Sequence, residues 1–223
     1  PATHSMTRTC HQCGNSCRDL ARFCDHCGTP LAAPAPAVHR TRTELRQGTL
    51  MFCDLVNSTR LANQMDPDDL RLVFAAFQRV VREVIWRHGG TLIRFAGDGA
   101  FAVFGYPAAQ EDSAESALRA GLGLVGAIRG ESLPGLPHLQ ALQVRVGVAT
   151  GPVVMGEMIG GAVVGEQSVT GPVAHLAARL AASAAPDSLV ACDDTRQLVG
   201  QRFELQSLGT LALKGFPAPV AAW

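Results

Sequence analysis

The sequence has neither an excess of one charge nor a long hydrophobic run. Its 223 residues carry 19 Lys plus Arg and 19 Asp plus Glu, so the formal net charge is zero. Without a basic field, the chain lacks a general electrostatic means of holding a nucleic-acid backbone. Its apolar stretches are strand-length or interrupted by glycine and charged residues, well short of the roughly 20 apolar residues that span a bilayer. We therefore expect no nucleic-acid partner and no membrane span.

The N-terminal region also lacks the charged-then-apolar pattern of a secretion signal. We therefore expect a cytoplasmic protein in a reducing compartment, where disulfides are rare. Hydrophobic residues make up 47% of the chain, enough for the core of one ordinary domain plus a small module. Cys53 and Cys192 lie far apart in strand-like apolar segments, and we expect both to pack as small hydrophobic side chains.

The other five cysteines cluster near the N-terminus. Four of them form two Cys-x-x-Cys-Gly knuckles, whose cysteines are Cys10, Cys13, Cys24 and Cys27. The glycine after each second cysteine permits the tight turn that aims the sulfurs at one point. Four thiolates at this spacing suit tetrahedral Zn²⁺, which would supply most of the folding energy of so short a module. We predict a small zinc ribbon over residues 1–30, with a structural or partner-binding role.

Two alternatives for this module follow from the same residues. The cysteines can instead form a disulfide staple, which the expected reducing compartment disfavours. Cys17, His11 and His26 can also serve as zinc ligands. The doubled knuckle nevertheless favours the four paired cysteines.

An Ala/Pro segment at residues 31–43 is typical of a semi-rigid spacer. Residues 44–223 then alternate strand and helix patterns, as an α+β domain should. Asp66 and Pro67 predict the start of a helix that stops at His88 to Gly90, and residues 173–184 predict another. A half-buried strand is expected at residues 142–148, where apolar residues alternate with Gln143 and Arg145. A hairpin is expected from residues 91–95 and 99–104.

Two aspartates follow short apolar strands. Asp54 closes the segment from Thr49, and Asp98 lies in the predicted hairpin turn. Two carboxylates held at strand ends can share Mg²⁺ or Mn²⁺, and paired metals clamp the attacking and leaving oxygens of a phosphoryl displacement. The pair predicts a metal-nucleotide enzyme. The alternative is that each aspartate only caps a strand end.

Five ordered blocks of the sequence resemble the class III nucleotidyl cyclases. In chain order they are residues 50–59, 94–99, 147–153, 169–180 and 213–216. The segment from Phe95 to Asp98 is especially similar to the soluble, bicarbonate-responsive adenylyl cyclases and their bacterial relatives. The resemblance implies a ferredoxin-like α+β core that works as a head-to-tail homodimer, with each active site built from both protomers.

The resemblance also implies roles for individual residues. Asp54, Asp98 and the carbonyl of Leu55 would bind two Mg²⁺ or Mn²⁺ ions. The backbone of Asn57, Ser58 and Thr59 would bind phosphate at a helix start. Arg179 of the second protomer would stabilise charge that develops on the phosphate. The alternative for Arg179 is an ordinary ion pair on a helix surface.

Three positions depart from the pattern of the resembling family. Arg94 stands where adenylyl cyclases place a Lys that donates to adenine, and Ser168 stands where they place an Asp or Thr acceptor. An Arg donor with a Ser acceptor still complements adenine, so we expect ATP as substrate. Arg can also read the O6/N7 edge of guanine or a pyrimidine carbonyl, which keeps GTP and pyrimidine nucleotides open. His175 replaces an Asn that positions the ribose, and it is either an active-site group or an interface histidine.

The sequence thus predicts an adenylyl cyclase that converts ATP to cyclic AMP and pyrophosphate. Retention of both predicted metal carboxylates favours this reading. The departures at Arg94, Ser168 and His175 favour the alternative of a catalytically degenerate domain that senses nucleotides or binds a protein. In either case the zinc ribbon is a candidate surface for a protein partner.

Overall fold

The computed structural model describes residues 7–10, 12–18, 21, 23–29, 31, 44–130, 142–157 and 167–223. The chain divides into two compact units, Pro1–Thr41 and Arg42–Trp223, and each is described by itself below. Of the expected spacer at residues 31–43, only Leu31 is described, and the rest lies outside the described residues.

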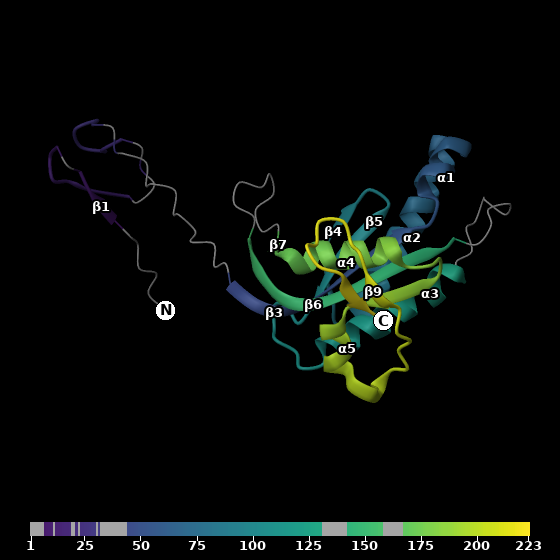
Figure 1. Cartoon of the computed structure of the whole chain (residues 1–223). Coiled ribbons are helices and arrows are strands. Elements are labelled where there is room, and N and C mark those ends of the chain that lie inside the picture. Colours follow the sequence, from purple (N-terminus) through teal and green to yellow (C-terminus); the bar gives the residue numbers. More distant parts are fainter. Residues whose placement is uncertain are drawn as a thin grey trace. The chain divides into compact units, whose positions relative to one another are not determined.

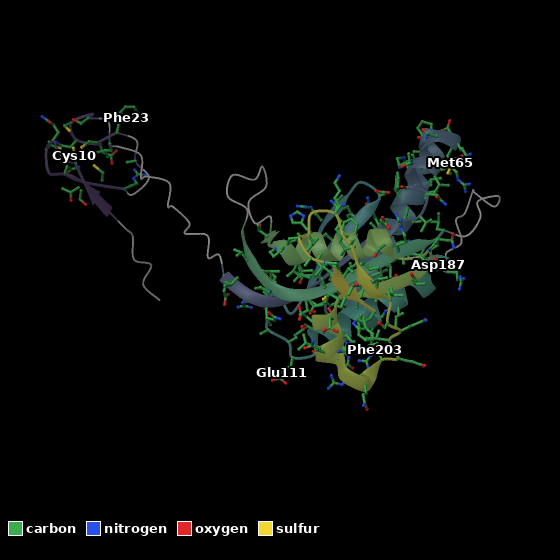
Figure 2. The ribbon with its side chains drawn as sticks, in the orientation of Figure 1. Cys10, Phe23, Met65, Glu111, Asp187 and Phe203 are labelled. Carbon is green, nitrogen blue, oxygen red and sulfur yellow. The ribbon has the colours of Figure 1, made fainter. Side chains whose placement is uncertain are left out.

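The N-terminal unit is built around its cysteines. Strands β1 (Thr7–Thr9) and β2 (Ser16–Arg18) pair antiparallel. The buried core consists of Cys10, Cys17, Cys24 and Leu31. So few apolar groups cannot outweigh the conformational entropy of ordering the segment, so this unit needs a cross-link or a metal. Figure 2 shows Cys10 labelled within this unit.

The C-terminal unit is organised on one six-stranded sheet (Figure 1). The strand order is β4-β5-β3-β6-β7, with neighbours antiparallel, and β8 pairs parallel with β6. The strands are β3 (Glu44–Leu55), β4 (Thr91–Ala96), β5 (Gly99–Phe104), β6 (Val144–Glu157), β7 (Gln167–Thr170) and β8 (Ser188–Ala191). A separate two-stranded sheet pairs β9 (Gly209–Leu211) with β10 (Val220–Ala222). The expected hairpin of β4 and β5 is confirmed.

Helices cover both faces of the main sheet. The helices described in this unit are α1 (Ser58–Gln64), α2 (Pro67–Arg87), α3 (Ser113–Arg129), α4 (Pro172–Ser183), α5 (Asp193–Val199) and the 3₁₀ turn η1 (Gly200–Arg202). α2 and α3 form a hydrophobic core with one face, and α4 forms a second core with the opposite face. Helices packed on an antiparallel sheet confirm the expected α+β class. No helix within the described residues has both the length and the apolar character needed to cross a bilayer.

The alternation of side chains along β3 separates the two cores. Met51, Cys53 and Leu55 face the core under α2 and α3, whereas Leu50 faces the core under α4. Successive strand residues point to opposite faces, so an apolar strand serves both layers. Burial raises the pKa of Cys53 to about 12, and Cys192 is also buried. Both thiols therefore pack as predicted.

The helix predictions are confirmed, with small shifts at the ends. α2 begins at Pro67, and the Asp66 carboxylate accepts a hydrogen bond from the Asp68 amide at 2.9 Å. This N-cap satisfies one of the amides that a helix start leaves without a partner. α4 begins after Gly171, at Pro172, and ends at Ser183.

The strand expected at residues 142–148 is half-buried as predicted except at Gly147. Val144, Val146 and Val148 are buried as expected, but Gly147, which alternates with them on the side of Gln143 and Arg145, is buried too. α4 packs directly on this part of β6: a Cβ added at Gly147 would lie 2.1 Å from the Ala177 carbonyl oxygen. Residue 147 is a glycine because helix and strand backbones touch there.

We expect Gly147→Ala to lower the free energy of unfolding of the C-terminal unit by about 3 kcal/mol, because overpacking here meets backbone atoms that cannot rotate away. Gly126→Ala is the matched control, since Gly126 lies inside α3 with nothing within 4 Å of the added Cβ. That change should be neutral or stabilise by up to about 1 kcal/mol. Urea unfolding followed by circular dichroism measures both, and equal effects would contradict the close approach of α4.

Candidate functional site

The pairing register of β3 brings the two predicted metal aspartates to one end of the sheet. Asp54 lies opposite Gly99 of β5 on one side and opposite Arg145 of β6 on the other. Asp98 occupies the turn that precedes Gly99, and the Leu55 amide donates to the Asp98 carbonyl at 3.2 Å. Backbone pairing therefore holds both carboxylates close together, before any side-chain contact is considered.

Asp54 is held by a bidentate ion pair. The Nε and Nη2 atoms of Arg145 donate to its two carboxylate oxygens at 3.1 and 2.8 Å. The Asp54 side chain is only 16% exposed. Burial raises the pKa of Asp54, Arg145 opposes that rise, and the charge of Asp98 adds to it. The effect of Asp98 on this pKa shows that the two carboxylates lie within electrostatic reach of each other.

Asp98 has a neutral partner instead. The Ser58 hydroxyl donates to its Oδ2 atom. Ser58 is the buried first residue of α1, and Asn57 before it adopts a left-handed conformation with φ 59°. Asn tolerates this conformation better than most residues, and it lets the chain turn from β3 directly into α1. The turn thereby brings Ser58 to the carboxylate of Asp98.

An open cavity of about 680 Å³ lies beside these groups. Its lining residues are Leu55, Asn57, Ser58, Thr59, Arg60, Asn63, Gln64, Asp98 and Arg145. The predicted metal and phosphate residues other than Asp54 thus line one cavity. Asp54 does not line it, but it is paired with Arg145, which does. Carboxylate and carbonyl oxygens are the donors that hard divalent cations prefer, so this donor set suits Mg²⁺ or Mn²⁺.

A second cavity, of about 310 Å³, is lined by two of the predicted nucleotide residues, Arg94 and His175. Its other lining residues are Phe52, Ala96, Phe101, Val169, Thr170, Gly171, Ala174 and Ala178. Arg94 follows an irregularity in the pairing of β4 with β5, at the point where such bulges re-aim side chains. The side chain of Ser168 lies outside the described part of the chain.

Arg179 lies apart from both cavities within a single chain. It is exposed on α4, one helical turn beyond the exposed His175. Within the described residues Arg179 forms no ion pair, and it lines neither cavity. Arg145 was not predicted as a site residue. The strand pattern alone marked it only as the polar side of β6, and the ion pair becomes visible only from the register of β3 against β6.

The four knuckle cysteines converge as predicted, with their sulfur atoms within 4.8 Å of one another. The Sγ atoms of Cys10 and Cys27 are 3.7 Å apart, and those of Cys13 and Cys24 are 3.6 Å apart. Zinc–sulfur bonds of about 2.3 Å in a tetrahedron require sulfur separations of about 3.8 Å, whereas a disulfide requires about 2.0 Å. The cysteines are free, so the disulfide staple is not formed.

Hydrogen bonds within this cluster shift the thiol pKa values in opposite directions. Amides of Cys27 and His26 donate to Cys24 and lower its pKa to about 6. The Asn15 amide favours the thiolate of Cys13, but hydrogen bonds with the other thiols and burial outweigh it and raise the pKa of Cys13 to about 12. The thiolate, the form that binds metal, is therefore favoured at Cys24. Cys17 is buried, and its thiol donates to the Asn15 carbonyl at 3.6 Å. His11 lies outside the described residues.

Comparison with known proteins identifies the larger unit. Residues 41–223 match the model of the adenylate and guanylate cyclase catalytic domain. An uncharacterized protein of Rhizobium meliloti (strain 1021) is 37% identical over 182 residues, which cover 81% of this chain and 17% of that protein. An uncharacterized protein of Mycobacterium tuberculosis (strain H37Rv) is 35% identical over 211 residues, covering 91% of this chain and 37% of that protein. The chain spans well under half of the length of these relatives.

Solved structures show the same architecture. The guanylyl cyclase Cya2 matches with a TM-score of 0.75 at 28% identity, over 81% of this chain and 92% of that one. The adenylyl cyclase CyaB from P. aeruginosa matches with a TM-score of 0.74 at 22% identity, over 81% and 93% of the two chains, which shows the fold alone. Neighbours of both substrate types leave the base undetermined. This fold and the family match over residues 41–223 show that the chain belongs to the class III adenylyl and guanylyl cyclase catalytic domain family.

Proposed function

We propose that the C-terminal unit is an adenylyl cyclase that converts ATP to cyclic AMP and pyrophosphate. The observation that carries the proposal is the placement of Asp54 and Asp98 at adjacent strand ends beside a cavity of about 680 Å³. Two carboxylates at adjacent strand ends suit a two-metal centre, for which a pure binding module has no need.

Asp54, Asp98 and the Leu55 carbonyl would hold two divalent ions. Bound Mg²⁺ or Mn²⁺ supplies activation of the ribose 3′-hydroxyl and neutralisation of charge on the triphosphate. Asn57, Ser58 and Thr59 line the cavity at the start of α1, and their amides would bind phosphate oxygens, as amides at helix starts do. These residues orient the triphosphate, and Ser58 in addition fixes the carboxylate of Asp98.

We propose that the active site is completed by a second copy of the chain in a head-to-tail homodimer. The carboxylate cavity and the cavity of Arg94 and His175 share no lining residue. Arg179 is exposed on α4 and lines neither. The carboxylates of one protomer would therefore face Arg94, His175 and Arg179 of the second. There Arg179 would stabilise the charge that develops during cyclisation.

ATP is the proposed substrate because of the chemistry of the second cavity. Arg94 supplies donors, and none of the residues described as lining this cavity is acidic. A carboxylate would accept hydrogen bonds from the N–H groups of guanine, whereas the ring nitrogens of adenine accept hydrogen bonds from an Arg side chain. The proposed acceptor for the adenine amino group is Ser168. GTP or a pyrimidine nucleotide remains the competing substrate, because a guanidinium also pairs with carbonyl oxygens.

A second candidate function is a degenerate cyclase domain that binds nucleotide or protein without turnover. The observation that favours it is the bidentate ion pair that already occupies Asp54. A carboxylate engaged in this way is as typical of a structural ion pair as of a metal site.

For the N-terminal unit we propose one structural Zn²⁺ held by Cys10, Cys13, Cys24 and Cys27, in a ribbon over residues 1–30. Residues 31–43 would link it to the catalytic domain at 44–223. Phe23 is 59% exposed in a unit with few apolar side chains. An exposed aromatic side chain of this kind suits contact with a protein partner.

The purified chain should convert ATP with Mn²⁺ into a single cyclic product, with less product from GTP, CTP or UTP. Asp54→Ala and Asp98→Ala should each lower turnover at least about 100-fold, because metal ions contribute several kcal/mol to such transition states. Asp194→Ala is the control, since Asp194 is exposed on α5 away from the cavity. Chromatographic separation of the products reports both turnover and base choice. No product from any nucleotide would support the degenerate domain instead.

Mixing two inactive variants tests the shared active site. Asp54→Ala and Arg179→Ala should each be inactive alone, and their mixture should recover up to about a quarter of wild-type activity, because random pairing leaves one intact site in half of the dimers. Turnover of ATP before and after mixing measures the recovery. An active Arg179→Ala protein, or no recovery from stable mixed dimers, would contradict the head-to-tail arrangement.

Elemental analysis of the purified chain should find about one zinc per chain. Cys24→Ser should lose it, whereas Cys17→Ala should retain it, because Cys17 stands outside the group of four converging sulfurs. Removal of zinc with a chelator should make the N-terminal unit sensitive to protease, since the metal supplies most of its folding energy. A zinc-free chain with four reactive thiols and a protease-resistant unit would refute the zinc site.

A further inference from the structure

We propose that Arg145 is a positioning residue that holds Asp54 in the metal-free protein and must release it before a divalent cation binds there. This inference rests on the proposed metal site at Asp54 and Asp98. It adds an exchange step to metal binding, in which the Arg145 guanidinium leaves the Asp54 carboxylate as the divalent cation binds there.

The contacts show that Arg145 engages both carboxylate oxygens of Asp54. Each carboxylate oxygen receives one N–H, from Nε at 3.1 Å and from Nη2 at 2.8 Å. The two residues are direct cross-strand partners, so their backbones already stand opposite each other when the side chains meet. Parallel hydrogen bonds between Arg and a carboxylate are among the strongest and most directional that side chains form.

Burial makes this ion pair difficult to share with a metal. The Asp54 side chain is 16% exposed and that of Arg145 is 29% exposed. Charges in such surroundings are screened less than charges at the surface. A divalent cation on the same carboxylate would lie close to the guanidinium, and the two positive charges would repel each other. Binding at Asp54 therefore requires the guanidinium to move.

Asp98 does not impose the same requirement. Its partner is the neutral hydroxyl of Ser58, which can rotate and offer a lone pair in place of its proton. Of the two carboxylates, only Asp54 is thus held by a cation within the described residues. The Asp54 contact is the one that opposes metal entry.

The structure leaves room for the released side chain. Arg145 lines the same cavity of about 680 Å³ as Asn57, Ser58 and Thr59. Rotation about its side-chain bonds can carry the guanidinium into this open space while the strand pairing of β6 stays intact. The exchange is a side-chain movement, and it needs no rearrangement of the sheet.

Metal binding without nucleotide tests the exchange independently of catalysis. The probe is Mn²⁺, and the loss of the free-ion signal in electron paramagnetic resonance reports binding to the full chain. Arg145→Gln removes the charge and keeps a hydrogen-bonding group, so we expect Mn²⁺ affinity to rise on the order of tenfold, the worth of one charge-assisted contact. Arg145→Lys keeps the charge but loses the bidentate contact, so its Mn²⁺ affinity should lie between those of the wild type and Arg145→Gln.

Arg60→Gln is the matched control for a general change in the electrostatic potential of the cavity. Arg60 lines the same cavity, but within the described residues it contacts neither aspartate. Its loss should change Mn²⁺ affinity by less than that of Arg145. Equal gains from both variants, or an unchanged or weaker affinity in Arg145→Gln, would overturn the proposal.

Asp54→Asn separates this inference from the proposed function. If Asp54→Asn binds Mn²⁺ as the wild type does, the metal site itself is wrong. If Asp54→Asn loses Mn²⁺ while Arg145→Gln behaves as wild type, only the exchange is wrong. Circular dichroism confirms that each variant is folded.

A second measurement follows the wild-type chain and needs a variant only to identify one signal. In ¹⁵N NMR of the wild-type chain, the Arg145 Nε–H signal, identified by its absence in Arg145→Lys, should shift or exchange rapidly with water as Mg²⁺ saturates the site. An Nε–H signal that stays unchanged at saturation would show that the ion pair persists, and that the release does not occur.

Discussion

The register of β3 between β5 and β6 is the constraint on which the rest of the candidate site depends. Asp54 meets Gly99 on one side and Arg145 on the other, and the turn before Gly99 carries Asp98. A slip of one residue would turn every side chain of β3 to the opposite face of the sheet. The register is itself secured by burial, because Met51, Cys53 and Leu50 fit two different cores. The core packing that fixes the register of β3 therefore also fixes the geometry of the candidate site.

The distribution of polar groups is the basis for the proposed shared active site. The carboxylates lie where β3 ends and α1 begins, whereas His175 and Arg179 lie on the exposed side of α4. Both regions are rigidly attached to the same sheet, so side-chain rotation alone does not bring them together. A second copy of the chain supplies the missing half in the proposed mechanism. Control of association would then control activity.

Much of the fold was predictable because local signals agreed with packing. The Asp66 N-cap, the apolar stripe of α2 and the hairpin of β4 and β5 were all found from spacing and turn residues. The burial of Gly147 in β6 was not found, because a glycine gives no hydrophobic signal and its burial comes from the approach of α4. The alternation of apolar residues along a strand identifies one apolar face, but it cannot reveal a helix that covers the opposite face.

The sequence by itself determined the family resemblance, the four clustered cysteines, and the two aspartates with the proposed phosphate-binding turn between Asn57 and Thr59. These are local patterns, in which residue type and spacing carry the chemistry. Only the tertiary structure decided that Arg145 pairs with Asp54, that Arg94 and His175 share a cavity, and that Arg179 stands apart from the carboxylates of its own chain. Those relations join strands and helices far apart in sequence. They depend on sheet register and helix packing, which long-range contacts set and no short motif encodes.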